Sequence, residues 1–255
     1  MKRTLSMLLS GVLLGPSSHA ALNLSTLHFP VEVSFSGFTA PAIWATTTPG
    51  PGQLDSDHWA MNTEGSLTTT AATFGPDQTS GQGSSTGSES ATGVYAFEVE
   101  AGVTALGVQP TGTFWSPGMF TLRLQNATGG TVTSMNVDWT AWVYNDQGRS
   151  NDLRLLFSSD NATYTPAGVA LDVISPADAG AAPVSWQSTP RSFTVTGLSL
   201  ADGEDYYLRW GGDDVGGAGS RDEFALSALR VTPVPEPAAL GLLALAGVSL
   251  FRRRR

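Results

Sequence analysis

The stretch FTLRLQNATGG, from Phe120 to Gly130, decides the fold class of this chain of 255 residues. Its apolar residues Phe120, Leu122 and Leu124 alternate with polar ones, which is the two-residue period of a β-strand with one buried face. Asn126 and the glycines after it favour a turn through their own backbone chemistry. The stretch therefore predicts a half-buried strand that ends in a turn.

The same alternation recurs along the chain, and residues 21–232 contain no stretch with a sustained helical period. Turn signals such as Asn145-Asp-Gln-Gly separate the alternating runs. Many short strands joined by polar turns predict an all-β fold, a two-sheet β-sandwich with jelly-roll-like connections. The runs are Tyr95, Phe97 and Val99; Val137, Trp139, Ala141 and Val143; Leu153, Leu155 and Phe157; Phe193 and Val195; Tyr206, Leu208 and Trp210; and Phe224 and Leu226.

Residues 75–93, which read GPDQTSGQGSSTGSESATG, contain no large apolar side chain. A segment of this composition cannot offset the entropy of its own ordering by burial, so we expect a long surface loop. The piece upstream is too short to build a core by itself. Residues 21–232 are therefore predicted to form one domain.

The N-terminus has the three parts of a secretory signal peptide. Lys2 and Arg3 are positively charged, residues 5–14 are mostly apolar, and the small residues Ser18 and Ala20 stand at positions −3 and −1 of a cleavage site. Residues 1–20 are predicted to direct export through the secretion machinery and to be removed by signal peptidase after Ala20.

Charge and cysteine content exclude several classes of function. Seven arginines stand against 21 acidic residues in 21–232, a net charge of about −14, and such a surface repels the phosphates of nucleic acids. The chain has no cysteine, which excludes thiol catalysis and zinc–thiolate sites. Stability must come from a hydrophobic core without disulfides.

The chain ends in PVPEPAALGLLALAGVSLFRRRR, residues 233–255. Its apolar run, residues 238–251, would form a helix about 21 Å long, shorter than the ~30 Å hydrocarbon core of a bilayer. The four adjacent arginines Arg252, Arg253, Arg254 and Arg255 exclude burial of this run in a protein core. They fit a membrane stop that keeps the C-terminus in the cytoplasm.

The triplet Pro235, Glu236 and Pro237, the short apolar helix and the arginine cluster together resemble the PEP-CTERM sorting signal of exported bacterial proteins. That resemblance implies a short transmembrane helix that anchors the chain in the inner membrane. It also implies recognition of the triplet by a membrane protease of the exosortase type, followed by transfer to the cell surface or the extracellular matrix.

Six stretches between Trp59 and Thr232 resemble a β-rich domain found in many such exported proteins, and beside nuclease or lamin-tail modules in others. Relatives often carry an Asp-Asp pair where this chain has Ser227 and Ala228, so it departs from any site built on that pair. The resemblance implies no settled biochemical activity. The stretches are GVYAF from Gly93, ALGVQP from Ala105, LRLQNATGGTVTS from Leu122, VYNDQGRS from Val143, YYLRW from Tyr206 and SRDEFAL from Ser220.

The sequence predicts no catalytic residue. The two histidines of residues 21–232, His28 and His58, stand in no hydrolase or metalloprotease motif, and the chain has no G-x-S-x-G sequence. A pair of carboxylates facing each other across a cleft, as glycoside hydrolysis requires, can always be imagined among 21 acids. We therefore expect the protein not to be an enzyme.

A glycine-rich loop that begins at Gly211 brings four carboxylates close along the chain. Hard oxygen ligands suit Ca²⁺, but their order does not match an EF-hand, and Arg221 would compete for them through salt bridges. A solvated loop held by structural hydrogen bonds is the favoured interpretation, and a calcium site is the alternative. The four candidate ligands are Asp213, Asp214, Asp222 and Glu223.

Seven tryptophans suggest a different kind of site, because flat exposed aromatic rings stack on sugar faces. Trp142 and Tyr144 share the strand face opposite Val137, Trp139 and Val143, and the more aliphatic face is the better candidate for the core. Trp142 and Tyr144 could then line a glycan platform on the outside. Packing is the alternative, since aromatic side chains pack more often than they bind.

Three functions remain. The first is a non-enzymatic protein of the cell envelope or extracellular matrix with a structural or adhesion role. The alternative is a module that binds extracellular polysaccharide through exposed aromatics. A secreted hydrolase is the least favoured.

Overall fold

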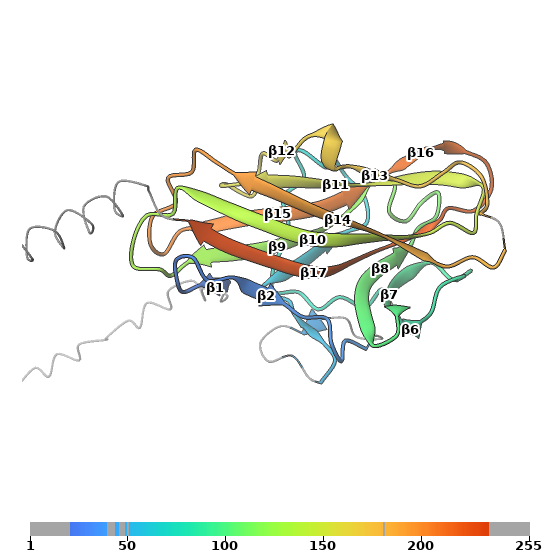
Figure 1. Ribbon diagram of the computed structural model, residues 1–255, viewed down its shortest axis with the longest axis horizontal. Coiled ribbons are helices and arrows are strands. Elements are labelled where there is room, and N and C mark those ends of the chain that lie inside the picture. The colour runs from blue at the N-terminus through green and yellow to red at the C-terminus, as the bar shows by residue number, and fades with distance from the viewer. Residues whose placement is uncertain (1–20, 40–43, 46–48, 50, 181, 235–255) are drawn as a thin grey trace, which may run out of the picture.

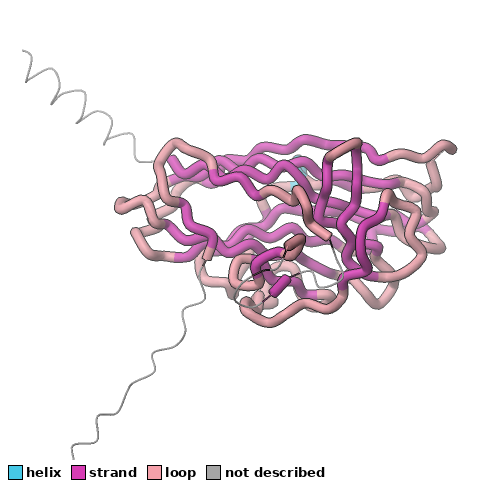
Figure 2. The backbone as a smooth tube through the Cα atoms, turned by 90° about the horizontal axis from the view of Figure 1, so that it is seen from below, coloured by secondary structure: helices cyan, strands magenta, loops and turns pink. Residues whose placement is uncertain are grey.

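The structure is a computed structural model that describes residues 21–39, 44–45, 49, 51–180 and 182–234. It is an all-β sandwich of two stacked sheets, which confirms the predicted fold class (Figure 1). Within the described residues the one helical element is the short 3₁₀ turn η1, Val169–Leu171. Figure 2 shows strands running through the body of the sandwich.

The first sheet is built on three long antiparallel strands, in the order β9-β15-β11. These are β9 (Gly118–Asn126), β15 (Asp205–Gly212) and β11 (Arg149–Ser158). Short strands extend the sheet. Beside β9 lie β1 (Leu22–Leu24) and β5 (Trp59–Asn62), and beside β11 lie β12 (Thr165–Pro166), β13 (Val173–Ile174) and β16 (Asp214–Gly217).

The second sheet has the order β14-β10-β17-β8-β7-β6, with β2 also paired to β17. Its strands are β14 (Trp186–Val195), β10 (Ser134–Tyr144), β17 (Glu223–Val234), β8 (Val103–Gln109), β7 (Gly93–Glu100), β6 (Gly81–Ser85) and β2 (Val31–Val33). A separate pair consists of β3 (Trp44–Ala45) and β4 (Leu54–Asp55).

The main core lies between the inward faces of the two sheets. Leu122 of β9, Trp210 of β15 and Trp139 of β10 all belong to it and are at most 3% exposed. Trp59, from the piece upstream of residues 75–93, packs against Trp210 with ring centroids 6.2 Å apart. The upstream piece thus contributes to the same core as the rest of the described residues.

Two segments differ from the sequence expectation. Residues 75–93, expected to be a surface loop, contain the edge strand β6, which runs parallel to β7. A ladder of backbone hydrogen bonds needs no apolar side chain, so composition alone does not reveal this strand. At the other end, β17 extends to Val234, which pairs with Ser134, so residues 233–234 belong to the sheet and not to the C-terminal segment.

The predicted signal peptide, residues 1–20, lies outside the described residues. So does the C-terminal segment from residue 235 onward, with the Pro-Glu-Pro triplet, the expected helix 238–251 and the arginine cluster. In the part of the chain that is described, no helix combines the length and apolarity needed to cross a membrane.

Arg209 of β15 fastens residues 67–70 to the first sheet. Its side chain is fully buried and donates hydrogen bonds to Thr121 Oγ1 at 3.0 Å and to the carbonyl oxygens of Leu67 and Thr70, both at 2.8 Å. Its guanidinium lies 3.3 Å from the centre of the Tyr164 ring. Burial lowers the pKa of Arg209 to about 10. The side chain is therefore charged at neutral pH, and all of its N–H groups can donate.

Replacing Arg209 with Met should lower the free energy of unfolding by about 3 kcal/mol or more, because two carbonyls and a hydroxyl lose their buried donor. Urea unfolding followed by tryptophan fluorescence measures the loss. Arg230→Met is the matched control, since Arg230 is 51% exposed and its surface ion pair is worth about 1 kcal/mol at most. Equal losses in the two variants would contradict the structural role of Arg209.

Candidate functional site

The strand β10 divides its side chains between the core and the outside of the sandwich. Because Trp139 and its alternate neighbours point inward, Asp138, Thr140, Trp142 and Tyr144 point outward. Strand pairing extends this outer face onto β17. Asp138 is the register partner of Arg230, Thr140 that of Ser227 and Trp142 that of Ala225.

Trp142 packs in a second hydrophobic cluster on this outer side of the sheet. It is 7% exposed, and its Nε1 donates to Ser227 Oγ at 2.7 Å. Tyr95 and Phe97 of β7 belong to the same cluster, and Trp186 of β14 packs against it. Phe97 and Tyr144 each contact Trp186, at 4.8 and 5.3 Å between ring centroids. We call Tyr95, Phe97, Trp142, Tyr144 and Trp186 the aromatic strip.

A connecting segment, residues 86–91, contacts the aromatic strip, and we call it the strap. Trp186 Nε1 donates to the Thr86 carbonyl at 2.8 Å, and Tyr95 Oη donates to the Ala91 carbonyl at 2.7 Å. Gly87 lies so close to Tyr144 that a Cβ would come within 2.9 Å of the ring, and its φ of 109° also favours glycine.

The strap and the cluster correct the hypothesis of an exposed glycan platform at Trp142 and Tyr144. Both residues lie on the face away from the core, as the alternation predicts. Trp142 is nevertheless buried and Tyr144 is half-buried beside the strap. The physical reason is that backbone carbonyls of the strap accept hydrogen bonds from Trp186 and Tyr95. A segment without large apolar side chains can therefore still lie against aromatic rings.

A groove of about 510 Å³ opens on the same outer face, beside the aromatic strip. It lies where the neighbour of β17 changes, because β8 pairs with residues 224–226 and β2 with residues 229–231. Ser227 and Ala228 have no strand partner on that side. The register against β10 also shifts there, and Ala228 has a φ of 50°, which residues other than glycine rarely adopt. Such strained bulges cluster at functional sites.

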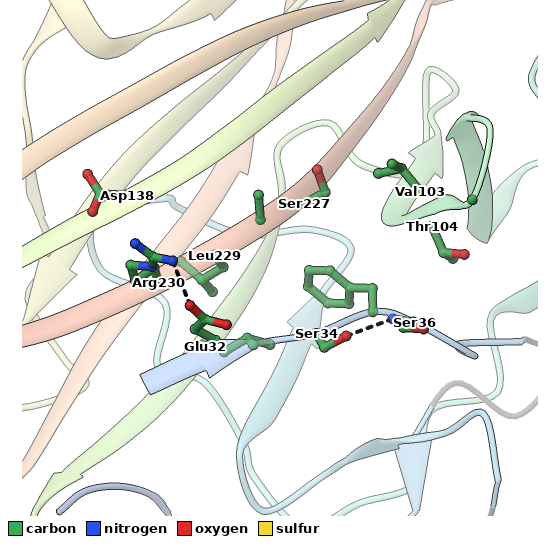
Figure 3. A pocket seen from close by; sticks show the side chains of 13 residues that line it. Glu32, Ser34, Ser36, Val103, Thr104, Asp138, Ser227, Leu229 and Arg230 are labelled. Atoms are coloured by element: carbon green, nitrogen blue, oxygen red, sulfur yellow. Dashed lines mark hydrogen bonds and ion pairs between the residues drawn. The ribbon is translucent and has the colours of Figure 1, made fainter. Parts of the chain in front are cut away.

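The groove combines charged and hydroxyl groups with an apolar floor. In Figure 3, Asp138 and the Arg230–Glu32 ion pair lie at one end and Val103 at the other, with Ser227 between them. Arg230 Nη2 donates to Glu32 Oε1 at 2.6 Å. The floor and the remaining hydroxyls come from Phe35, Leu229, Ser34, Ser36 and Thr104.

Asp138 is a charged residue of the groove whose side chain has no partner among the described residues. Its half-buried carboxylate makes no hydrogen bond or ion pair with any described residue. Sequence reasoning does not single out Asp138, Arg230 or Glu32, because they meet only through the pairing of three strands that are distant along the chain. Ser227 and Ala228, where the sequence differs from the domain that it resembles, both line the groove.

The four acidic residues of the proposed calcium loop do not come together. Asp214 forms an ion pair with Arg149, and Asp213 accepts a hydrogen bond from Ser116 Oγ at 3.0 Å. Asp222 and Glu223 are fully buried elsewhere. Across the described residues, no group of three or more acids or histidines is arranged to hold a metal ion.

Arg221 forms no ion pair within 4 Å with a described carboxylate, but it lies close enough to Asp213 and Asp214 for their charges to act on it. It is 1% exposed, and its Nη1 donates to the carbonyl oxygens of Thr111 and Trp115, at 2.9 and 2.8 Å. Its Nε donates to Asn151 Oδ1. Arg221 therefore fixes the loops at this end of the sandwich, while Arg149 binds the carboxylate of Asp214.

Neither His28 nor His58 lines the groove. His58 Nε2 lies 3.7 Å from Asp55 Oδ2, and burial lowers the pKa of His58. The backbone N–H of His28 donates to the Pro233 carbonyl at 2.9 Å.

Comparison with known proteins gives matches to solved structures alone, since no protein-family profile and no curated protein matches the chain. A carbohydrate-binding module, CBM27-1 of Caldicellulosiruptor saccharolyticus in complex with mannohexaose, is 10% identical, with 82% of this chain and 99% of that one covered and a TM-score of 0.40. The CBM22-1 xylan-binding domain of Paenibacillus barcinonensis Xyn10C is 11% identical, with coverage of 57% and 82% and a TM-score of 0.36.

A third similar structure is the K3 cleaved adhesin domain of Lys-gingipain from Porphyromonas gingivalis, 12% identical, with coverage of 68% and 91% and a TM-score of 0.37. At these identities and TM-scores the likeness carries no ligand or activity to this chain.

Glu223 ties the strap to the second sheet. It is fully buried at the start of β17, and its Oε1 accepts a hydrogen bond from the Glu89 backbone N–H of the strap at 2.6 Å. Burial, and then the nearby Asp146, raise the pKa of Glu223 to about 8 from an ordinary value of 4.5. Between about pH 4.5 and pH 8 the folded protein thus holds a proton that the unfolded chain releases, and Glu223 lowers the stability of the fold as the pH rises through this window.

The variant Glu223→Gln should remove this contribution while keeping the oxygen that binds the strap. We expect the urea midpoint of the variant, minus that of the natural protein, to rise between pH 5 and pH 8 and to level off above. Glu100→Gln, on the exposed end of β7, serves as the matched control. A difference that stays constant or falls over this range would contradict the assignment.

Proposed function

We propose that the protein is an exported, non-enzymatic module that binds extracellular polysaccharide through the groove on the outer face of its second sheet. The observation that carries the proposal is the uncommitted carboxylate of Asp138 beside the exposed guanidinium of Arg230, over an apolar floor. Concave sites with an apolar lining and a few convergent polar groups are the usual form of a ligand site.

The chemistry of the groove fits the hydroxyl groups of a sugar. A carboxylate accepts hydrogen bonds from two neighbouring hydroxyls, and a guanidinium donates to their oxygens. Hydrogen bonds with ionised partners are stronger than neutral ones. The C–H face of a sugar ring would then lie against the partly exposed side chain of Val103 on the wall of the groove.

The charge of the domain favours neutral polysaccharides. Residues 21–232 carry a net charge of about −14, so chains of uronic acids are repelled at long range. Within the groove, Glu32 and Asp138 outnumber Arg230. A neutral chain meets no such repulsion.

The proposed cellular location of the module rests on sequence signals that lie outside the described residues. The signal peptide directs export, and the C-terminal segment with Pro235, Glu236 and Pro237 holds the protein in the inner membrane for an exosortase-type protease. Release to the cell surface or matrix would bring the groove to polysaccharide.

Replacing Asp138 with Ala should weaken the binding of a neutral polysaccharide by roughly tenfold or more, because hydrogen bonds to a charged group contribute about 1.5–3 kcal/mol. Affinity electrophoresis of the full chain in mild detergent, in gels containing mannan or xylan, measures the retention. Asp178→Ala, in an exposed loop away from the groove, is the matched control. Undiminished retention of Asp138→Ala, or no retention of the natural protein on any neutral glycan, would sink the proposal.

The intact mass of the protein recovered from its own cells tests the proposed address. We expect a protein that starts at Ala21 and ends near the Pro-Glu-Pro triplet. A mass that retains Arg255 would instead show a permanent anchor, and a mass that retains Met1 would contradict export by signal peptidase.

A further inference from the structure

A second cavity, of about 730 Å³, lies at the end of the sandwich where β11 and β14 finish and β15 begins. Residues 157–159, 163, 165 and 203–206 line it from the side of the first sheet, and residues 195–200 from the side of the second. It shares no lining residue with the groove. Its volume falls within the range of roughly 300–1,000 Å³ that is usual for small-molecule sites. We call this cavity the end cleft.

Stacked aromatic rings form one wall of the end cleft. The ring of Phe157 stacks on that of Tyr206, with centroids 6.4 Å apart and planes at 18°, and on that of Phe193, at 5.8 Å and 24°. Phe157 is only half-buried, so part of its ring is open to a ligand.

Tyr206 is a polar residue of the end cleft whose hydroxyl has no partner among the described residues. The residue is 2% exposed, yet its phenol makes no hydrogen bond with any described residue. Because the ring is buried but the hydroxyl oxygen is not enclosed, the hydroxyl opens into the end cleft, where it can exchange hydrogen bonds with water or a ligand. Burial also raises the pKa of Tyr206, so the phenol keeps its proton and can donate.

The rim of the end cleft is rich in hydroxyl groups and carries negative charge. Its exposed hydroxyls make no side-chain hydrogen bond with described residues, and the Glu204 carboxylate at the rim uses one oxygen to accept from the Ala201 N–H at 2.8 Å. Asp205 adds a second carboxylate, whose partner Arg123 lies 3.9 Å away. The hydroxyls belong to Ser159, Thr163, Thr165, Thr196 and Ser199.

We propose that the end cleft is a second binding site, for a neutral oligosaccharide, independent of the groove. The aromatic wall of Phe157 offers a flat face to a sugar ring, while Tyr206 and the rim hydroxyls offer donors and acceptors to its hydroxyl groups. Glu204 and Asp205 exclude anionic sugars. The ligand class follows from the chemistry of the end cleft itself, although it coincides with that of the proposed function.

Two binding sites on different parts of the module would make it bivalent for polysaccharide. One protein can hold two segments of polysaccharide at once, which increases avidity for one long chain or cross-links two chains. Cross-linking is what a protein of an extracellular matrix needs. The end cleft therefore adds bridging to simple attachment.

Calorimetric titration of the full chain in mild detergent with mannohexaose, xylohexaose and cellohexaose tests the second site. We expect two binding sites per chain for at least one of these ligands. Tyr206→Phe, which removes only the unpartnered hydroxyl, should weaken one site roughly three- to tenfold and leave the other unchanged. Ser199→Trp, which fills the rim from an exposed position, should abolish that site, while Ala179→Trp in a remote exposed loop should leave both intact.

The Asp138→Ala background separates this inference from the proposed function. Binding that persists in Asp138→Ala and disappears when Ser199→Trp is added supports the end cleft, even if the groove then proves empty. A single site that Asp138→Ala removes entirely overturns the end cleft and leaves the groove standing. The absence of binding to all three hexasaccharides overturns both.

Discussion

The contact between Trp139 of β10 and Trp210 of β15 joins the two sheets, and the rest of the structure depends on it. The two rings meet edge to face, with centroids 6.3 Å apart, in a core that no disulfide supports. Because Trp139 points inward, its neighbours on β10 point outward, since successive side chains of a regular strand lie on opposite faces. The packing of the core therefore determines which residues form the outer face, before any ligand is considered.

On that outer face, strand pairing decides what is covered and what is open. The aromatic strip is closed by the strap, whose carbonyl oxygens bond to Trp186 and Tyr95. Beside it the groove stays open because β17 exchanges β8 for β2 as its neighbour at Ser227 and Ala228. The break in the ladder exposes Asp138, Arg230 and the floor between them. A local irregularity in one strand thus produces the concave surface on which the proposed function rests.

The sequence predicts the fold well and the site poorly, for a physical reason. Alternation along β9, β10 and β15 reports burial of a strand face, which is a local property, so the strands and their inward residues could be read directly. It also placed Trp142 on the correct face. It could not show that Trp142 is buried in a cluster with Tyr95 and Phe97 of β7, because that cluster depends on the order of strands that are distant along the chain. Nor could it find Asp138 beside Arg230 and Glu32, which meet only through long-range register.

The central claim is that a neutral glycan binds the groove where β17 lacks a strand partner. Hydrogen–deuterium exchange of the full chain, with and without a saturating neutral hexasaccharide, tests this most directly. We expect slower exchange in residues 31–36, 102–104 and 227–230, with the amides of β9 unchanged. Slowing confined to elements outside these residues, with a ligand that demonstrably binds, would contradict the account.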